Sequence, residues 1–314
     1  AENCGFYQGH LVGVPESGGT PHFFTTATGP GESHAAIWMG GGAPAIGANG
    51  DLWVATGPGV YTAKHPSDAY DYSDGVLEIS PSLRLVQFFA PANWLANNSD
   101  DLDMTTEPVL LPDGQVILAG KSQVIYLLDG SHLGGIGKQE AELSPVCSTN
   151  IDGGSAHIGM IAYLPCLSGT IAVKATKSPA RLHLLWTAPV AGGPPIVAGG
   201  LVWTISQSGH LYGLDPATGE VRQQAAVGVP ANHFPTPGIG AGLMLVPSAQ
   251  SVVAFRTSAD VGQAAGAVRS APRANPAPGP ASGGPMIAGV ALGCVAAAGA
   301  TGWFIWFIRR RRRA

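Results

Sequence analysis

The sequence predicts an all-β fold of consecutive four-stranded antiparallel sheets, and two observations carry that prediction. First, a unit made of a proline, an apolar run, a glycine and two further apolar runs recurs about every 42 residues. Its pivot glycines stand 64, 45, 41 and 42 residues apart, at Gly50, Gly114, Gly159, Gly200 and Gly242. Second, each unit holds three or four short β-rich runs. A fixed period of this length with this many strands is typical of β-propeller blades.

The runs around each glycine predict a hairpin of buried strands. The runs that follow the glycines are almost continuously apolar, and they are 52–54, 116–118, 160–163, 201–203 and 243–246. A continuous apolar run fits a strand that is buried on both faces. The glycine often stands beside Asn or Asp, as in Asn49-Gly50-Asp51, and these residues accept the positive φ of a tight turn. A third run completes each unit, at 76–79, 124–128, 170–173, 211–214 and 252–255.

The chain holds five complete or nearly complete repeats and one broken repeat. The turn 215–219 leads into a fourth strand at 220–225, but the last repeat lacks its fourth strand. Residues 9–15 have the pattern of a third strand whose first two strands are absent. Either the N-terminal strands close the ring against the last repeat, or upstream blades are missing from an N-terminally incomplete chain. We favour the second interpretation, with more blades in the intact protein than the five to six present here. No segment before residue 285 has convincing helical periodicity.

Composition divides the chain into four parts. Residues 1–256 are the predicted propeller, and 257–285 are an Ala/Pro/Gly-rich linker that is expected to be disordered. The 23 residues of 286–308 carry no charge, which is long enough to span a bilayer. The tail 309–314 begins with five arginines, and the positive-inside rule places it in the cytoplasm. We therefore expect a cell-membrane protein that contacts the lipid bilayer through Met286 to Ile308, with its propeller on the extracytoplasmic side. The alternative, a buried core helix, has nothing around it to pack against.

Charge and cysteine content limit the partners. Without the five tail arginines the chain has 11 basic and 20 acidic residues, and an acidic domain argues against nucleic acid as a partner. Cys147 and Cys166 bracket one predicted hairpin, and in an oxidising compartment they are candidates for a disulfide. Two free core thiols are the alternative. The nine histidines show no metal-ligand spacing, so no metal residue is expected.

The run Leu211-Tyr-Gly-Leu-Asp-Pro-Ala-Thr-Gly-Glu-Val221 and its glycine-pivoted neighbours resemble the repeat of the pyrroloquinoline-quinone (PQQ) propeller superfamily. The resemblance covers roughly residues 5–256. This superfamily includes quinoprotein alcohol dehydrogenases and non-catalytic relatives. The resemblance implies a bacterial, membrane-anchored propeller, and it says little about activity because one fold hosts many functions.

The resemblance also suggests site residues. The stretch 97–103 is similar to the acidic loop that supplies the catalytic base of the dehydrogenases, which implies that role for Asp101 or Asp103. Lys121 matches a basic residue that contacts the quinone, and Trp53 is a candidate for the aromatic floor, as are Trp38 and Trp203. Each of these has a plainer alternative: a solvated loop, a solvent-facing lysine, and tryptophans that pack blades. Pro58 stands where the dehydrogenases carry a calcium-binding Asn, and proline has no side-chain oxygen.

Two functions follow from these observations. The favoured one is an extracytoplasmic, membrane-anchored module that binds or scaffolds a protein or a cell-envelope polymer. The alternative is a PQQ-dependent alcohol or polyol dehydrogenase, and PQQ and calcium are expected only in that case. The enzyme would need Asp101 or Asp103, Lys121 and a flat aromatic around one central pocket, with metal-binding oxygens near Gly57. The segment between Gly50 and Gly114 is about twenty residues longer than its counterparts, and it could build either site.

Overall fold

The computed structural model describes residues 5–60, 69–190 and 192–256. All but the first of these residues belong to one compact unit, Phe6–Ala267. The predicted linker, membrane span and arginine tail lie outside the described residues. Within the described ranges, the structure contains no helix with the length and apolar character needed to cross a bilayer.

The described chain forms six sheets in chain order. The first pairs β1 (His10–Gly13) with β2 (His22–Thr25). The second contains β3 (Ala45–Ile46), β4 (Leu52–Ala55), β5 (Val76–Ile79) and β6 (Leu85–Ala90), with β10 (Gly135–Ile136) parallel to β6. The third contains β7 (Val109–Leu110), β8 (Gln115–Ala119), β9 (Ile125–Asp129) and β11 (Ala141–Leu143). The fourth contains β12 (Ala156–Ile158), β13 (Ile161–Cys166), β14 (Gly169–Lys177) and β15 (Ala180–Ala188). The fifth contains β16 (Ile196–Ala198), β17 (Leu201–Ile205), β18 (His210–Leu214) and β19 (Val221–Ala226), and the sixth contains β20 (Gly238–Gly240), β21 (Leu243–Ser248) and β22 (Ser251–Arg256).

The pivot glycines occupy equivalent turns in five sheets. Each lies between the first and second strand of its sheet, and each has a positive φ. The φ values are 86° at Gly50, 87° at Gly114, 55° at Gly159, 79° at Gly200 and 74° at Gly242. Glycine adopts this region without the clash that a Cβ causes. The need for a positive φ at this turn therefore explains why glycine recurs at these positions in the sequence. The predicted repeat is confirmed.

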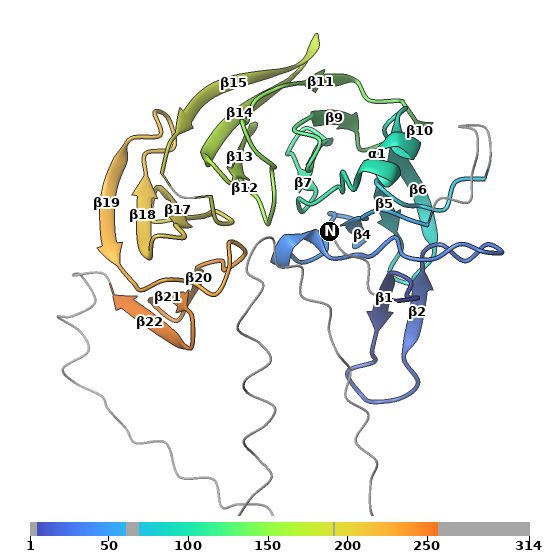
Figure 1. Cartoon of the computed structure of the whole chain (residues 1–314), viewed down its shortest axis with the longest axis horizontal. Helices are drawn as coiled ribbons and strands as arrows, with labels where there is room; N and C mark the ends of the chain where they lie inside the picture. The colour runs from blue at the N-terminus through green and yellow to red at the C-terminus, as the bar shows by residue number, and fades with distance from the viewer. Residues whose placement is uncertain (1–4, 61–68, 191, 257–314) are drawn as a thin grey trace, which may run out of the picture. The chain divides into compact units, whose positions relative to one another are not determined.

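Successive sheets pack against each other through their apolar faces. One core cluster joins Leu77 of β5 to Leu128 of β9, and the next joins Ile117 of β8 to Val173 of β14. Two further clusters continue this order to the fifth and sixth sheets. In Figure 1 the short first strands β7, β12 and β20 lie nearest the middle, and β11, β15 and β19 lie on the outside. This order of sheets, with first strands innermost and fourth strands outermost, is the blade arrangement of a β-propeller.

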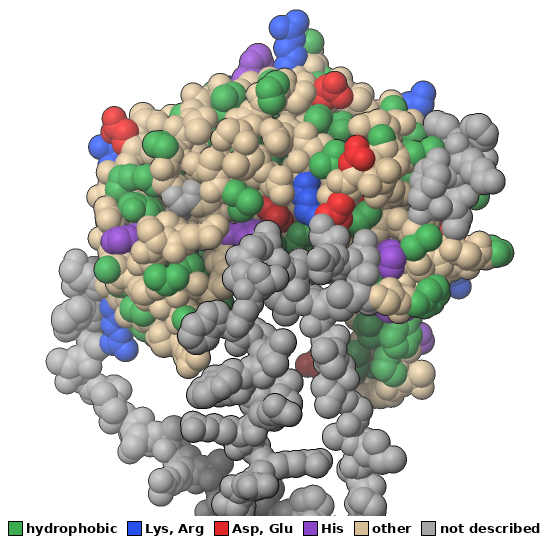
Figure 2. Space-filling view, viewed as in Figure 1, with side chains coloured by type: hydrophobic (Ala, Val, Ile, Leu, Met, Phe, Trp, Pro, Cys, Tyr) green, Lys and Arg blue, Asp and Glu red, His purple; other side chains and the backbone are tan. Residues whose placement is uncertain are grey.

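Charged side chains are sparse on the face drawn in Figure 2.

Two details differ from or complete the prediction. A short helix, α1 (Trp94–Asp100), lies in a part of the chain whose sequence shows no convincing helical periodicity. Its seven residues are too few for a helical period to show, although Trp94 and Asn97 are both buried on one face. The last sheet has three strands among the described residues, as predicted. Among the described residues, β1 and β2 pair with each other and neither pairs with β22. A ring closed by these N-terminal strands, the alternative left open by the sequence, is therefore not seen.

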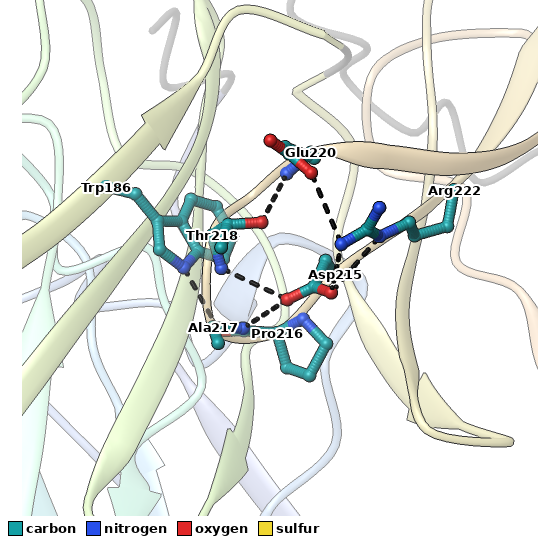
Figure 3. A network of polar contacts seen from close by, with 7 residues as sticks. All are labelled: Trp186, Asp215, Pro216, Ala217, Thr218, Glu220 and Arg222. Atoms are coloured by element: carbon teal, nitrogen blue, oxygen red, sulfur yellow. Dashed lines mark hydrogen bonds and ion pairs between the residues drawn. The ribbon is translucent and has the colours of Figure 1, made fainter.

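The turn between β18 and β19 ties one blade to the preceding one (Figure 3). The backbone N–H groups of Ala217 and Thr218 donate to Asp215 Oδ1 over 2.9 and 3.2 Å, and Arg222 donates twice to Oδ2. Hydrogen bonds from the Ala217 backbone and from Arg222 lower the pKa of Asp215. Trp186 of β15 donates from Nε1 to the carbonyl of Pro216 over 3.0 Å. The tryptophan of one sheet therefore fixes the outer turn of the next.

Candidate functional site

Four charged residues, Asp74, Asp101, Asp103 and Lys121, form what we call the Asp–Lys cluster. Asp74 precedes β5, the two other aspartates precede β7, and Lys121 follows β8. In antiparallel pairs the end of one strand and the start of the next lie at the same sheet edge. Backbone hydrogen bonds join the segments, from Lys121 N to the Asp103 carbonyl and from Asp74 N to the Gly57 carbonyl, both over 3.0 Å. All three aspartates come from the extended segment between Gly50 and Gly114.

Lys121 lies between two carboxylates. Its Nζ is 3.0 Å from Asp101 Oδ2 and 2.5 Å from Asp103 Oδ2. The Lys121 side chain is 12 % exposed and that of Asp103 is 2 % exposed. Lys121 is therefore not solvent-facing, and Asp103 is buried although Ser99 and Asp100 of the same acidic stretch are exposed. Figure 2 shows acidic and basic side chains side by side near the middle of the face drawn.

Burial and charge act in opposite directions on this pair. Burial raises the pKa of Asp103, and the attraction of Lys121 only partly offsets this, which leaves the pKa at about 6. Burial by itself would lower the pKa of Lys121, but the two carboxylates together raise it. Burial also raises the pKa of the half-buried Tyr7, with further contributions from the charges of Asp103 and Asp101. The cluster thus keeps its ammonium charged while one of its carboxylates titrates close to neutral pH.

Asp74 is the residue that sequence reasoning missed. Its side chain is fully buried, its φ is 45°, and neither carboxylate oxygen has a hydrogen-bond partner among the described residues. Burial raises its pKa well above the ordinary value, and repulsion from Asp103 adds to the rise. The sequence signal was the pair Asp74-Gly75 before a buried strand. Such a pair also marks an ordinary turn, so it does not single out a site.

A hydrogen-bonded network supports the loop that carries Asp74. Asp71 Oδ1 accepts from the backbone N–H of Ser73 over 3.1 Å and from its hydroxyl over 2.5 Å. Asn98 of α1 donates to Ser73 Oγ over 2.9 Å and accepts from the Gly59 N–H over 2.8 Å. The helix is therefore hydrogen bonded at Gly59 and at Ser73, the residue that precedes Asp74.

Trp38 supplies the aromatic side of the cluster. Lys121 Nζ lies 5.9 Å from the centroid of its ring, and Phe234 meets the ring edge-on at 5.7 Å between centroids. Gly57 makes this approach possible, because a Cβ there would lie 3.0 Å from Trp38 Nε1 and 3.3 Å from Asp103 Oδ1. Trp53 packs instead in the core between the second and third sheets. Trp203 packs against the sixth sheet, so Trp38 is the one of the three candidates that contacts Lys121.

Two further acidic residues extend the charge around the strand ends. Asp152 is buried, with Oδ2 3.3 Å from His233 Nε2 and with Oδ1 unpartnered in the described part of the chain. Its charge also raises the pKa of Asp103. Burial raises the pKa of Glu107, which lies beside Gly42, to about 7. The residues before β7 and β12 therefore present carboxylates to the same region.

Cys147 and Cys166 are joined in a disulfide, with their Cα atoms 6.0 Å apart. Both lie in the core cluster between the third and fourth sheets, together with Ile151. The bridge links the segment after β11 to the end of β13, so it is placed to brace the fourth blade at the strand ends near Asp152.

The residues present do not fit calcium or the quinone. In the described ranges no three His, Cys, Asp or Glu side chains are placed to hold a metal ion. The two nearest carboxylates already share the ammonium of Lys121. Pro58 offers only its carbonyl, which accepts from the N–H of Ala35. PQQ carries three carboxylates, and like charges at Asp74, Asp103 and their neighbours would repel it.

Comparisons with known proteins concern the fold. No protein-family model matches the chain, and no curated protein matches it. BamB from Moraxella catarrhalis is 15% identical over 78% of this chain and 70% of its own, with a TM-score of 0.44. A chain of the mitotic checkpoint complex is 7% identical over 73% of this chain and 65% of its own, with a TM-score of 0.51. The computationally designed Ika8 protein is 10% identical over 81% and 82%, with a TM-score of 0.43. At 7% identity and a TM-score of 0.51, the checkpoint-complex chain shares the fold with this chain and nothing more.

Proposed function

We propose that this chain is an extracytoplasmic binding propeller of the PQQ-like repeat type, held at the membrane by residues 286–308, with the Asp–Lys cluster as its ligand site. The observation that carries the proposal is Asp74. A buried ionised carboxylate without a donor is several kcal/mol less stable than a paired one, so it needs either a proton or a ligand to complete it. Groups of this kind gather at functional sites more often than in structural cores.

The position of the cluster supports a binding role. Its residues sit on loops at strand ends, where a rigid sheet positions side chains that the fold itself does not need. The network of Asp71, Ser73 and Asn98 orders these loops in advance, which lowers the entropy lost on binding. A protein or a cell-envelope polymer is the proposed partner class.

A quinoprotein-type dehydrogenase is the second candidate, on one observation. Asp101, Asp103 and Lys121 come together with Trp38, as the base, cation and flat aromatic of such an enzyme would. The calcium donors are the part that does not fit. The full chain mixed with PQQ and Ca²⁺ should therefore show no stoichiometric change in quinone absorbance and no dye-linked alcohol oxidation. Uptake with turnover that Asp103→Asn abolishes would replace our proposal with the dehydrogenase.

The binding proposal is tested with a library of small fragments and ligand-observed NMR on the full chain. The library contains cations, anions and neutral sugars. We expect some fragments to bind, and we expect Asp74→Asn and Asp103→Asn to remove their signals. Asp113→Asn, in the turn at the opposite end of β7, is the matched control and should leave them unchanged. If every fragment that binds does so equally well in all three variants, the cluster is not the ligand site.

A further inference from the structure

We propose that the Asp–Lys cluster receives a second organic cation, an alkylammonium or guanidinium group, beside the ammonium of Lys121. This inference rests on the proposed function, and it names the chemistry of the ligand. The groups that carry it are the unpartnered oxygens of Asp74, Asp103 and Asp152 and the aromatic ring of Trp38.

The first step is the balance of donors and acceptors. An ionised carboxylate only accepts hydrogen bonds, and an ammonium or guanidinium only donates them. Lys121 directs its donors to Oδ2 of Asp101 and Oδ2 of Asp103. Both oxygens of Asp74, Oδ1 of Asp103 and Oδ1 of Asp152 have no donor among the described residues. A ligand that satisfies these oxygens must bring several hydrogen-bond donors.

The second step is charge. Asp103 lies beside Gly57, whose carbonyl accepts from the backbone N–H of Asp74, and Asp103 is repelled by Asp101 and Asp152. Within the described part of the chain, Lys121 is the one Lys or Arg that forms an ion pair with them. An anionic ligand would be repelled. A neutral sugar would supply donors but would leave the excess negative charge in place, so a cation is the matching ligand.

The third step separates an organic cation from a metal ion. The described side chains offer no group of three ligands for a metal. The Trp38 ring already lies within the distance at which an aromatic face attracts a cation, 5.9 Å from Lys121 Nζ, and Phe234 meets that ring edge-on. Carboxylates beside an aromatic face suit an organic cation better than a hard metal ion, which prefers a cage of oxygens.

The test is calorimetric titration of the full chain at pH 8. The probes are Nα-acetyl-lysine amide and Nα-acetyl-arginine amide, with the isosteric neutral Nα-acetyl-norleucine amide as control. We expect both cationic probes to bind and the neutral probe not to bind. Asp74→Asn and Trp38→Leu should each weaken binding by about tenfold or more, and Asp113→Asn should not change it. Circular dichroism of each variant checks that it is folded, and the two variants act on different sides of the site.

Other results would overturn the inference. Equal binding of the norleucine probe would show that charge is not recognised. Dissociation constants weaker than about 10 mM for both cationic probes would show that protons alone complete the cluster. Tighter binding of CaCl₂ that Asp74→Asn removes would make this a metal site. Spermidine is titrated to separate two sources of the cation. Much tighter binding of spermidine than of the lysine probe would indicate a free polyamine, and equal or weaker binding would indicate a side chain presented by a partner. If the fragments that depend on the cluster are sugars or anions, this inference fails and the binding proposal stands.

Discussion

Lys121 Nζ lies 2.5 Å from Asp103 Oδ2, and this ion pair joins the end of β8 to the segment that enters β7. The backbones of the same two residues are also hydrogen bonded. A pair this buried holds the two strand ends in register, but it also takes two charges out of water. Replacing only one of the two residues should therefore lower the free energy of unfolding more than replacing both by apolar residues.

Replacement of Lys121 by Met leaves Asp101 and Asp103 without their shared cation. We expect the free energy of unfolding in urea at pH 8 to fall by about 3–5 kcal/mol, because a buried carboxylate then lacks its partner. The exposed Lys177→Met is the control, and it should change the value by less than about 0.5 kcal/mol. A small, equal effect of both substitutions would contradict the buried-pair description.

The raised pKa of Asp103 gives stability a pH dependence of known sign. Because the folded-state pKa of about 6 exceeds the ordinary value of 3.8, the folded protein binds more protons between these values. This residue's contribution to stability is therefore unaffected below about pH 4 and falls as pH rises to about 6, by about 2–3 kcal/mol in total. Asp74 acts in the same direction. In Asp103→Asn, urea unfolding between pH 4 and 7 should show a flatter pH profile. A wild-type profile that rises over this range would refute the assignment.

Gly219 and Gly200 separate two reasons for a glycine. Both have a positive φ, 75° and 79°, but a Cβ at Gly219 would lie 2.6 Å from Trp186 Cε3, whereas one at Gly200 meets nothing within 4 Å. Gly200→Ala should cost about 1 kcal/mol from backbone strain alone. Gly219→Ala should cost about 1–3 kcal/mol more, since the ring must move. Thermal unfolding measures both. In a Trp186→Leu background the excess at Gly219 should disappear, and its persistence would show that the ring is not the cause.

The repeat was predictable because its signals are local. Gly114 is needed by a turn that its own neighbours define, and the apolar runs beside it follow from burial on both faces. The helix α1 was not predictable, because seven residues hold less than two periods of its pattern. Local sequence signals therefore predicted the strands of the blades, but they did not predict the structure of the longer segment between Gly50 and Gly114.

The site was predictable only in part. The resemblance selected Asp103 and Lys121, and the structure brings them together. Asp74 and Trp38 lie on loops that are far apart in the chain, and both loops contact Gly57. No local sequence pattern predicts such a contact. Trp53 and Trp38 look alike in sequence, but only Trp53 lies in a strand, where it packs in the blade core.

The disulfide should contribute to stability as the chain-entropy model describes. Cys147 and Cys166 are 19 residues apart, and a loop of this length corresponds to about 3 kcal/mol. A Cys147→Ala, Cys166→Ala double variant should lose about that amount in urea unfolding. Added reductant should lower the stability of the wild type and leave the double variant unchanged. No effect of reductant on either protein would mean that the bridge does not form in solution.

The proposed membrane anchor predicts where a truncated chain is found. Residues 286–308 are uncharged and are followed by five arginines, a pattern that holds a span in a bilayer with its basic end in the cytoplasm. Expressed in bacteria behind an export signal, the full chain should stay with the membranes after a carbonate wash, and a chain that ends at residue 285 should be released. External protease should remove the propeller from the full chain in intact spheroplasts. A chain ending at residue 308 is the matched control for the arginines, and it should still be retained although its orientation becomes mixed. Release of the full chain by carbonate would rule out the anchor, and protection of the propeller from protease would reverse its proposed orientation.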